Sequence, residues 1–97
     1  ERVEKARRIQ RERYSGTDTK TNDEMTNAQV RAHCKLDGES EALLKNAFTR
    51  LNLTARASSR VLKVARTIAD LDGSQNICGR HIAEAIQYRS LDRKYWD

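Results

Sequence analysis

The chain has 97 residues, with 19 lysines and arginines against 14 aspartates and glutamates, and its net charge at pH 7 is +5. A chain of this length forms one small domain with one modest hydrophobic core. It contains no apolar run of the roughly 18 residues that cross a membrane and no apolar signal segment at its N-terminus, which favours a cytoplasmic protein without a membrane partner.

Residues 1–14 are predicted to form a helix. Its apolar stripe, Val3, Ala6 and Ile9, is too narrow to be stable alone in water, so this helix must pack on another element. The chain starts at Glu1 without methionine, inside the helical pattern, and we therefore expect it to be a piece of a longer protein.

The first helix also carries a cluster of positive charge. Its basic residues are Arg2, Lys5, Arg7, Arg8, Arg11 and Arg13. They can form a solvated helix face with ion pairs to glutamates four residues away. Alternatively, Arg7, Arg8 and Arg11 can contact the phosphates of DNA.

The next segment, from Ser15 to Glu24, is polar and has no apolar anchor, which predicts a flexible loop over residues 15–25. Thr26 or Asn27 then caps a short helix that ends near Cys34. Asp37 is the expected N-cap of a third helix. Its apolar positions are Leu44, Ala47, Phe48 and Leu51.

Thr54 caps the central helix, whose apolar face is the broadest in the chain. That face consists of Val61, Val64, Ala65, Ile68 and Leu71, widened by Leu62 and Ala69. Gly73 suits the left-handed residue that ends this helix, and Ser74 to Asn76 form a turn. The last helix covers residues 80–89 and buries Ile82, Ala83 and Ile86. The fold class is therefore all-α, a small bundle of four to five helices over residues 1–97.

A polar stripe runs along the central helix through Arg56, Arg60, Lys63, Thr67 and Asp70. Cations near a helix N-terminus are unfavourable by a few tenths of a kcal/mol to about 1 kcal/mol. The placement of Arg56 becomes favourable if a phosphate binds there. The alternative is that Arg56 and Arg60 are solvated or pair with acids elsewhere. Arg66 and Asp70 have the spacing of an ordinary helix pair.

The sequence offers no catalytic residue. It has no phosphate loop, no Gly-x-Gly-x-x-Gly and no candidate catalytic triad. Cys34 and Cys78 belong to no Cys-x-x-Cys pair, and with His33 and His81 they match no zinc-finger spacing. We expect no metal site and predict that both cysteines are buried as small apolar residues.

Three segments resemble the C-terminal domain of magnesium chelatase-related AAA+ ATPases of the ComM/YifB competence type. The first is Leu53-Thr54-Ala55-Arg56 together with the run from Arg60 to Leu71. The others are His33 to Asp37 and His81 to Arg93. The resemblance covers nearly the whole chain, and Ser58 and Ser59 depart from it because family members commonly carry bulkier residues there.

The resemblance implies that the chain is the helical lid of an AAA+ ATPase. A separate α/β domain would carry the phosphate loop and the magnesium-binding acid. Arg56 would be the sensor-2 residue that contacts the γ-phosphate of ATP, and Arg60 would form a salt bridge or contact nucleotide or a neighbouring subunit. The complete protein would use ATP and Mg²⁺ as a homo-hexamer that remodels DNA or drives branch migration, whereas this chain alone would bind neither cofactor.

Three alternatives stay open. The chain is also compatible with the lid of a metal-chelatase motor subunit. It is compatible with a free-standing basic helical module that binds DNA. Finally, it is compatible with an interaction domain that docks on a neighbour through Leu91, Tyr95 and Trp96.

Overall fold

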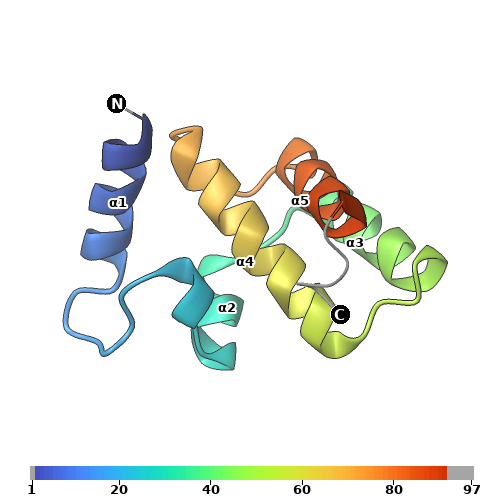
Figure 1. The fold of residues 1–97 in the computed structure, drawn as a ribbon, viewed down its shortest axis with the longest axis horizontal. Coiled ribbons are helices and arrows are strands. Elements are labelled where there is room, and N and C mark those ends of the chain that lie inside the picture. Colours follow the sequence, from blue (N-terminus) through green and yellow to red (C-terminus); the bar gives the residue numbers. More distant parts are fainter. Residues whose placement is uncertain (1, 92–97) are drawn as a thin grey trace.

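The computed structural model describes residues 2–91, and over this range the chain is built from helices (Figure 1). The elements in chain order are α1 (Arg2–Arg13), the 3-10 helix η1 (Asn22–Glu24), α2 (Asn27–His33), α3 (Gly38–Arg50), α4 (Ala55–Leu71) and α5 (Gly79–Leu91). The predicted all-α fold is confirmed. The one β feature of residues 2–91 is an isolated bridge between Leu36 and Ile77. No helix in this range is long and apolar enough to cross a membrane.

Three helices begin at the predicted N-cap residues. The hydroxyl of Thr26 accepts a hydrogen bond from the backbone N–H of Gln29, and the Gln29 side chain accepts one from the Thr26 N–H in return. The Asp37 carboxylate accepts from the N–H of Ser40 at 2.7 Å. Thr54 accepts from the N–H of Ala57 at 3.0 Å. Each cap satisfies a backbone donor that the helix itself leaves unpaired.

Helix α4 lies at the centre of the fold, with α1 on one side and α5 on the other (Figure 1). Val61, Ala65 and Ala69 on its inner face are fully buried. Ile77 and Ile82 pack into the same cluster from the turn after α4 and from α5. The small alanine side chains place neighbouring helices close to α4, and burial of the isoleucines supplies about 1.5–3 kcal/mol each.

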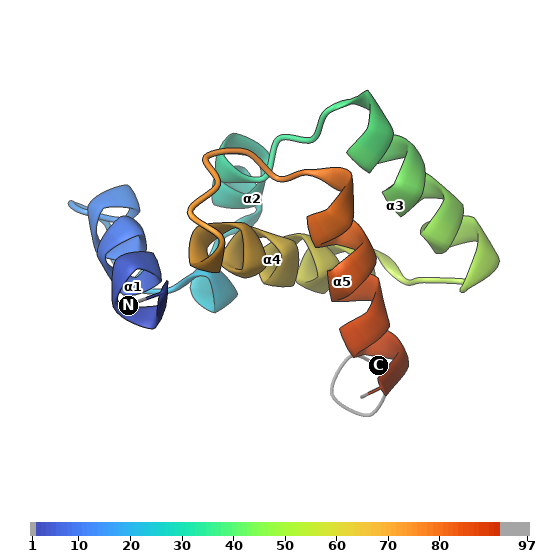
Figure 2. The same cartoon turned by 90° about the horizontal axis from the view of Figure 1, so that it is seen from above.

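Three positions of the predicted apolar faces point outward. Val3 in α1 is 54% exposed. Ala83 in α5 is exposed, and Ala85 is buried in its place because it shares a face with Ile82. Phe48 in α3 is 45% exposed. Helix α3 lies at the edge of the bundle and packs mainly against α5, so the side of α3 that carries Phe48 has little cover (Figure 2).

Buried His81 stabilises the start of α5. Its Nδ1 accepts a hydrogen bond from the backbone N–H of Cys78 at 2.9 Å, and its Nε2 lies 3.1 Å from a carboxylate oxygen of Asp72. An acceptor at Nδ1 leaves the proton on Nε2, which then donates to Asp72. The imidazole therefore takes the place of the glutamate that usually closes a capping box.

The polar segment over residues 15–25 has an apolar anchor at its end, Met25, which is buried in the core, and a polar anchor, Asn22. Asn22 is 1% exposed, and its side-chain oxygen accepts hydrogen bonds from Tyr14 and Arg13. Its amide nitrogen donates to Thr67 and Asp70, each at 3.0 Å. Thus η1 is attached to α1 and α4 through one side chain, and flexibility of the surrounding loop stays a prediction.

A buried carboxylate joins α1 to α4. Asp70 is fully buried and accepts two hydrogen bonds from the guanidinium of Arg13, both at 2.8 Å, and it lies 3.2 Å from a guanidinium nitrogen of Arg66. The hydrogen bond that Arg13 donates to Asp70 holds the pKa of Arg13 above its ordinary value. The predicted helix pair between Arg66 and Asp70 is confirmed. It is buried rather than solvated, because α1 and η1 cover this part of α4.

Arg66 extends the same network to the backbone. Its guanidinium donates to the carbonyl oxygens of Ser74 and Gln75 at 2.9 and 3.0 Å, and to that of His33 at 3.3 Å. One side chain thus ties the end of α2 and the turn after α4 to the centre of the bundle. Gly73 ends α4 with a φ of 73°, as predicted.

The two cysteines differ in environment. Cys34 is buried as predicted, and its burial raises the pKa of its thiol to about 11. Cys78 is only half-buried, because it lies in the turn before α5. No group of three metal-ligating side chains occurs among residues 2–91.

Replacement of Asp70 by alanine should leave the Arg13 and Arg66 guanidinium groups without their buried counter-charge. We expect the free energy of unfolding, measured by urea denaturation, to fall by about 3–5 kcal/mol. The matched control is Asp18→Ala in the exposed part of the polar segment, for which we expect a change within about 0.5 kcal/mol. Similar values for the two variants would contradict the proposed importance of the Asp70 network.

Alkylation should distinguish the two thiols. At pH 8, iodoacetamide should modify Cys78 in the native chain and leave Cys34 unmodified, as peptide mass analysis would show. The Cys34 pKa rises from 9.0 to about 11 on folding, so its neutral thiol stabilises the fold fully below pH 9 and loses this effect as the pH rises through 11. Equal modification of both cysteines under native conditions would contradict this arrangement.

Candidate phosphate-binding site on helix α4

The predicted phosphate ligand Arg56 lies in the first turn of α4, two residues after the Thr54 cap. Its side chain is exposed, and it makes no hydrogen bond or ion pair with any residue in the range 2–91. The backbone N–H groups of a first helical turn carry partial positive charge. A guanidinium at this position is electrostatically unfavourable for the isolated helix and favourable for a bound anion.

A polar hollow of about 450 Å³ lies beside Arg56. Its lining residues are Asn27, Ala55, Arg56, Ser59, Arg60 and Lys63. Three of these are cations and none is a carboxylate, so the positive end of the helix dipole and the side-chain charges act in the same direction. Such a surface is suited to a phosphate or another multiply charged anion.

The structure brings Arg60 to Arg56 as predicted and adds donors that the sequence analysis did not single out. Asn27 comes from α2, a separate element, and no local pattern marks it as a site residue. Ser59 follows Arg56 by three residues, and helical spacing alone indicates that the two share a face. The hollow therefore combines charged donors from α4 with an amide from α2.

The predicted polar stripe of α4 divides into two parts. Its N-terminal part, with Arg56, is exposed, and Arg60 and Lys63 are half-buried. Its C-terminal part ends in the fully buried Asp70. Because α1 and η1 pack on α4 at Asp70, this end of the polar stripe is closed to a ligand, whereas the end with Arg56 is open. Figure 1 shows α1 beside α4.

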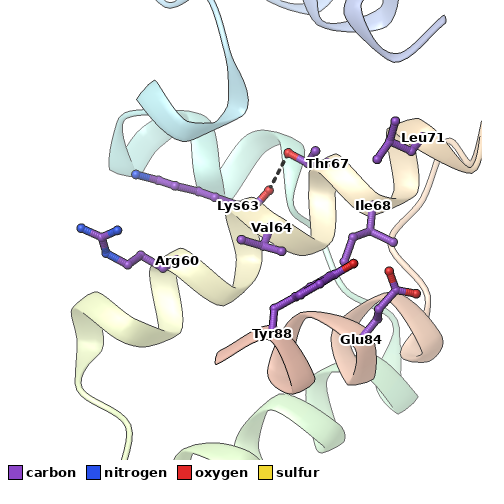
Figure 3. A pocket seen from close by; sticks show the side chains of 8 residues that line it. All are labelled: Arg60, Lys63, Val64, Thr67, Ile68, Leu71, Glu84 and Tyr88. Carbon is purple, nitrogen blue, oxygen red and sulfur yellow. Dashed lines mark hydrogen bonds between the residues drawn. The ribbon is translucent and has the colours of Figure 1, made fainter. Parts of the chain in front are cut away.

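A second hollow, of about 360 Å³, lies between α4 and α5 and continues the first, because Arg60 and Lys63 line both. Figure 3 shows Val64 and Ile68 on α4 opposite Tyr88 on α5, with Glu84 beside Ile68. The side chains of Arg60 and Lys63 extend from the other end of this groove (Figure 3). The Tyr88 side chain is 49% exposed.

Ser58 and Ser59, where the resemblance leads us to expect bulkier residues, lie on a third surface. Ser58 and Ser59 are half-buried and line a groove of about 600 Å³ between α2, α3 and the start of α4. The Ser58 hydroxyl is buried without a hydrogen-bond partner among the described residues. The small serine side chains therefore leave open space next to Phe48, which lines the same groove.

The candidate DNA-binding residues Arg7, Arg8 and Arg11 are exposed on α1. Helix α1 contacts the half of α4 that carries Asp70, so these arginines do not join Arg56 in one site (Figure 1). Leu91, Tyr95 and Trp96, the candidate docking residues, include two that lie outside the described range, and the Leu91 side chain is likewise not described.

Comparison with known proteins gives three related findings. A family model described as "Magnesium chelatase, subunit ChlI C-terminal" matches residues 1–89. The competence protein ComM of Haemophilus influenzae is 42% identical over 93 residues, which are 96% of this chain and 18% of that protein. The protein YifB of Escherichia coli is 42% identical over 83 residues, or 86% of this chain and 16% of that protein. No solved structure matches this chain.

Proposed function

The chain belongs to the magnesium chelatase subunit ChlI C-terminal family, and on this basis we propose that it serves as the helical lid of an AAA+ ATPase. It spans less than a fifth of the length of the curated relatives that it matches. An α/β domain of the same protein would hold the phosphate loop, and the lid would close over the bound ATP.

The observation that carries this proposal is Arg56 in the first turn of α4. Its guanidinium is exposed and lacks a partner among the described residues, and it stands beside a hollow lined by Arg60 and Lys63. A guanidinium binds phosphate oxygens through paired hydrogen bonds, and the free N–H groups of the first turn add further donors. The γ-phosphate of ATP matches this set of donors in charge and geometry.

Arg56 would act by electrostatics. As the γ-phosphoryl group is transferred to water, a fixed guanidinium stabilises the negative charge on its oxygens without forming a covalent bond. Loss of the phosphate would remove this contact and release the lid. Arg60 would add charge at the same end of the hollow, and Asn27 would orient the phosphate through its amide.

Mg²⁺ would be bound by the phosphates of ATP and not by the residues that line this hollow. The hollow has no carboxylate among its lining residues, and Mg²⁺ is held by oxygen ligands such as carboxylates and phosphates. The acid that binds the metal would therefore lie in the α/β domain. Mg²⁺ supplies charge neutralisation between the β- and γ-phosphates when it is bound.

The proposed assembly is a homo-hexameric ring that uses ATP to remodel DNA or drive branch migration. The exposed Arg7, Arg8 and Arg11 on α1 favour DNA, because three adjacent guanidinium groups provide phosphate contacts of the kind that non-specific binding needs. The metal-chelatase alternative rests on the family name, and it assigns the same role to Arg56 with a different substrate.

The Arg56→Ala variant of the complete gene product should lose ATP turnover by roughly 100-fold or more, because one preformed donor to the transferred phosphoryl group is removed. Steady-state phosphate release measures this effect. The control is Arg50→Ala, which removes an exposed arginine from the last turn of α3 and should leave turnover unchanged. Unchanged turnover in Arg56→Ala, with a helical circular dichroism spectrum, would refute the assignment.

Simultaneous replacement of Arg7, Arg8 and Arg11 by alanine should weaken duplex DNA binding and lower the slope of log K against log salt by about 2.7, since each phosphate contact contributes about 0.9. Fluorescence anisotropy at several salt concentrations gives this slope. The control removes the same charge at exposed positions outside α1, in Lys35, Lys45 and Arg50. An equal loss of slope in both variants would show that net charge, and not α1, determines DNA binding.

A further inference from the structure

The groove between α4 and α5 has two chemically different ends. Its apolar floor is formed by Val64, Ile68 and Leu71, and Tyr88 faces Val64 and Ile68 from α5 (Figure 3). Glu84 lies at one end. Arg60 and Lys63 lie at the other, and the proposed role of Arg56 makes no use of the space between these ends.

We propose that this groove binds single-stranded nucleic acid, with one base stacked on Tyr88 and the adjoining phosphates held by Arg60 and Lys63. Aromatic side chains of this size are usually buried, but Tyr88 is 49% exposed. Its ring is therefore available for stacking with the planar ring of a base. Base stacking on exposed aromatic side chains beside a basic groove is the general mode of binding to single strands.

Glu84 favours a nucleic acid base over an acidic peptide. An acidic side chain entering the apolar end of the groove would meet the carboxylate of Glu84 and be repelled. The exocyclic amino group of cytosine can instead donate a hydrogen bond to a carboxylate. Along the groove, the cations come first, then the apolar slot and then the carboxylate. A cytidine nucleotide presents the matching groups in the same order: the phosphate, the base and the amino group of the base.

A strand fits the groove better than a free nucleotide because the basic surface continues beyond it. Arg60 and Lys63 also line the polar hollow next to Arg56, so the positive surface extends along the first half of α4. Arg56 and Lys63 are separated by seven residues, which is about 10 Å of helix. This length accommodates successive phosphates of one strand, and the site remains complete without Arg56.

The test uses a fluorescein-labelled single-stranded oligodeoxycytidylate and measures its anisotropy with the 97-residue chain, all groove residues of which are described. The Tyr88→Leu variant, which keeps an apolar side chain without a π face, should bind roughly tenfold more weakly, in keeping with about 1–3 kcal/mol for one stacked base. Tyr88→Phe should bind like the original chain. Phe48→Leu is the matched control, because Phe48 is similarly exposed but lies on α3.

Two further measurements separate the strand from other ligands. Lys63→Ala should lower the salt slope by about 0.7, the contribution of one phosphate contact in a single strand. ATP can share Arg60 and Lys63 with the strand but lacks its successive phosphates, so at the same ionic strength it should displace the oligonucleotide only at concentrations well above those of an unlabelled strand. Equal binding by Tyr88→Leu and the original chain, or displacement by ATP at the same concentration as by an unlabelled strand, would overturn the proposal. Because ATP turnover is not measured, failure here leaves the role of Arg56 in hydrolysis unaffected.

Discussion

The carboxylate of Asp70 joins three elements of the described chain. It receives Arg13 from α1, Arg66 from its own helix and Asn22 from η1. A buried carboxylate loses its hydration, and the loss is offset only when every lone pair has a partner. Asp70 meets this condition, so the position of α1 is set by charge and hydrogen-bond geometry as well as by apolar contact.

This arrangement has a direct consequence for the candidate sites. Helices α1 and η1 cover the side of α4 that carries Asp70, and there Asp70 and Arg66 are paired within the buried network. The first half keeps Arg56, Arg60 and Lys63 around a polar hollow. A single helix thus carries a structural set of charges at one end and a potential ligand-binding set at the other.

The apolar core explains why polar contacts matter so much here. The buried face of α4 is rich in alanine, and much of the remaining core consists of single residues from several elements. A small domain buries a limited fraction of its apolar surface, so its net stability is a small difference between large terms. The hydrogen bonds of His81 at the start of α5 and of Arg66 to the backbone carbonyls therefore help to fix the conformation of the turn between α4 and α5.

Local patterns in the sequence were sufficient for the helices, their caps and Arg56 in the first turn of α4. Apolar periodicity and the cap residues Thr26, Asp37 and Thr54 depend on neighbours within four positions, which the sequence itself displays. The burial of Asp70 and the roles of Arg13 and Asn22 depend on residues 9 to 57 positions apart. The same is true of the groove between Val64 and Tyr88. Only tertiary packing brings such groups together. The residues next to a charged side chain in the sequence are the same whether that side chain is buried under another helix or exposed to water.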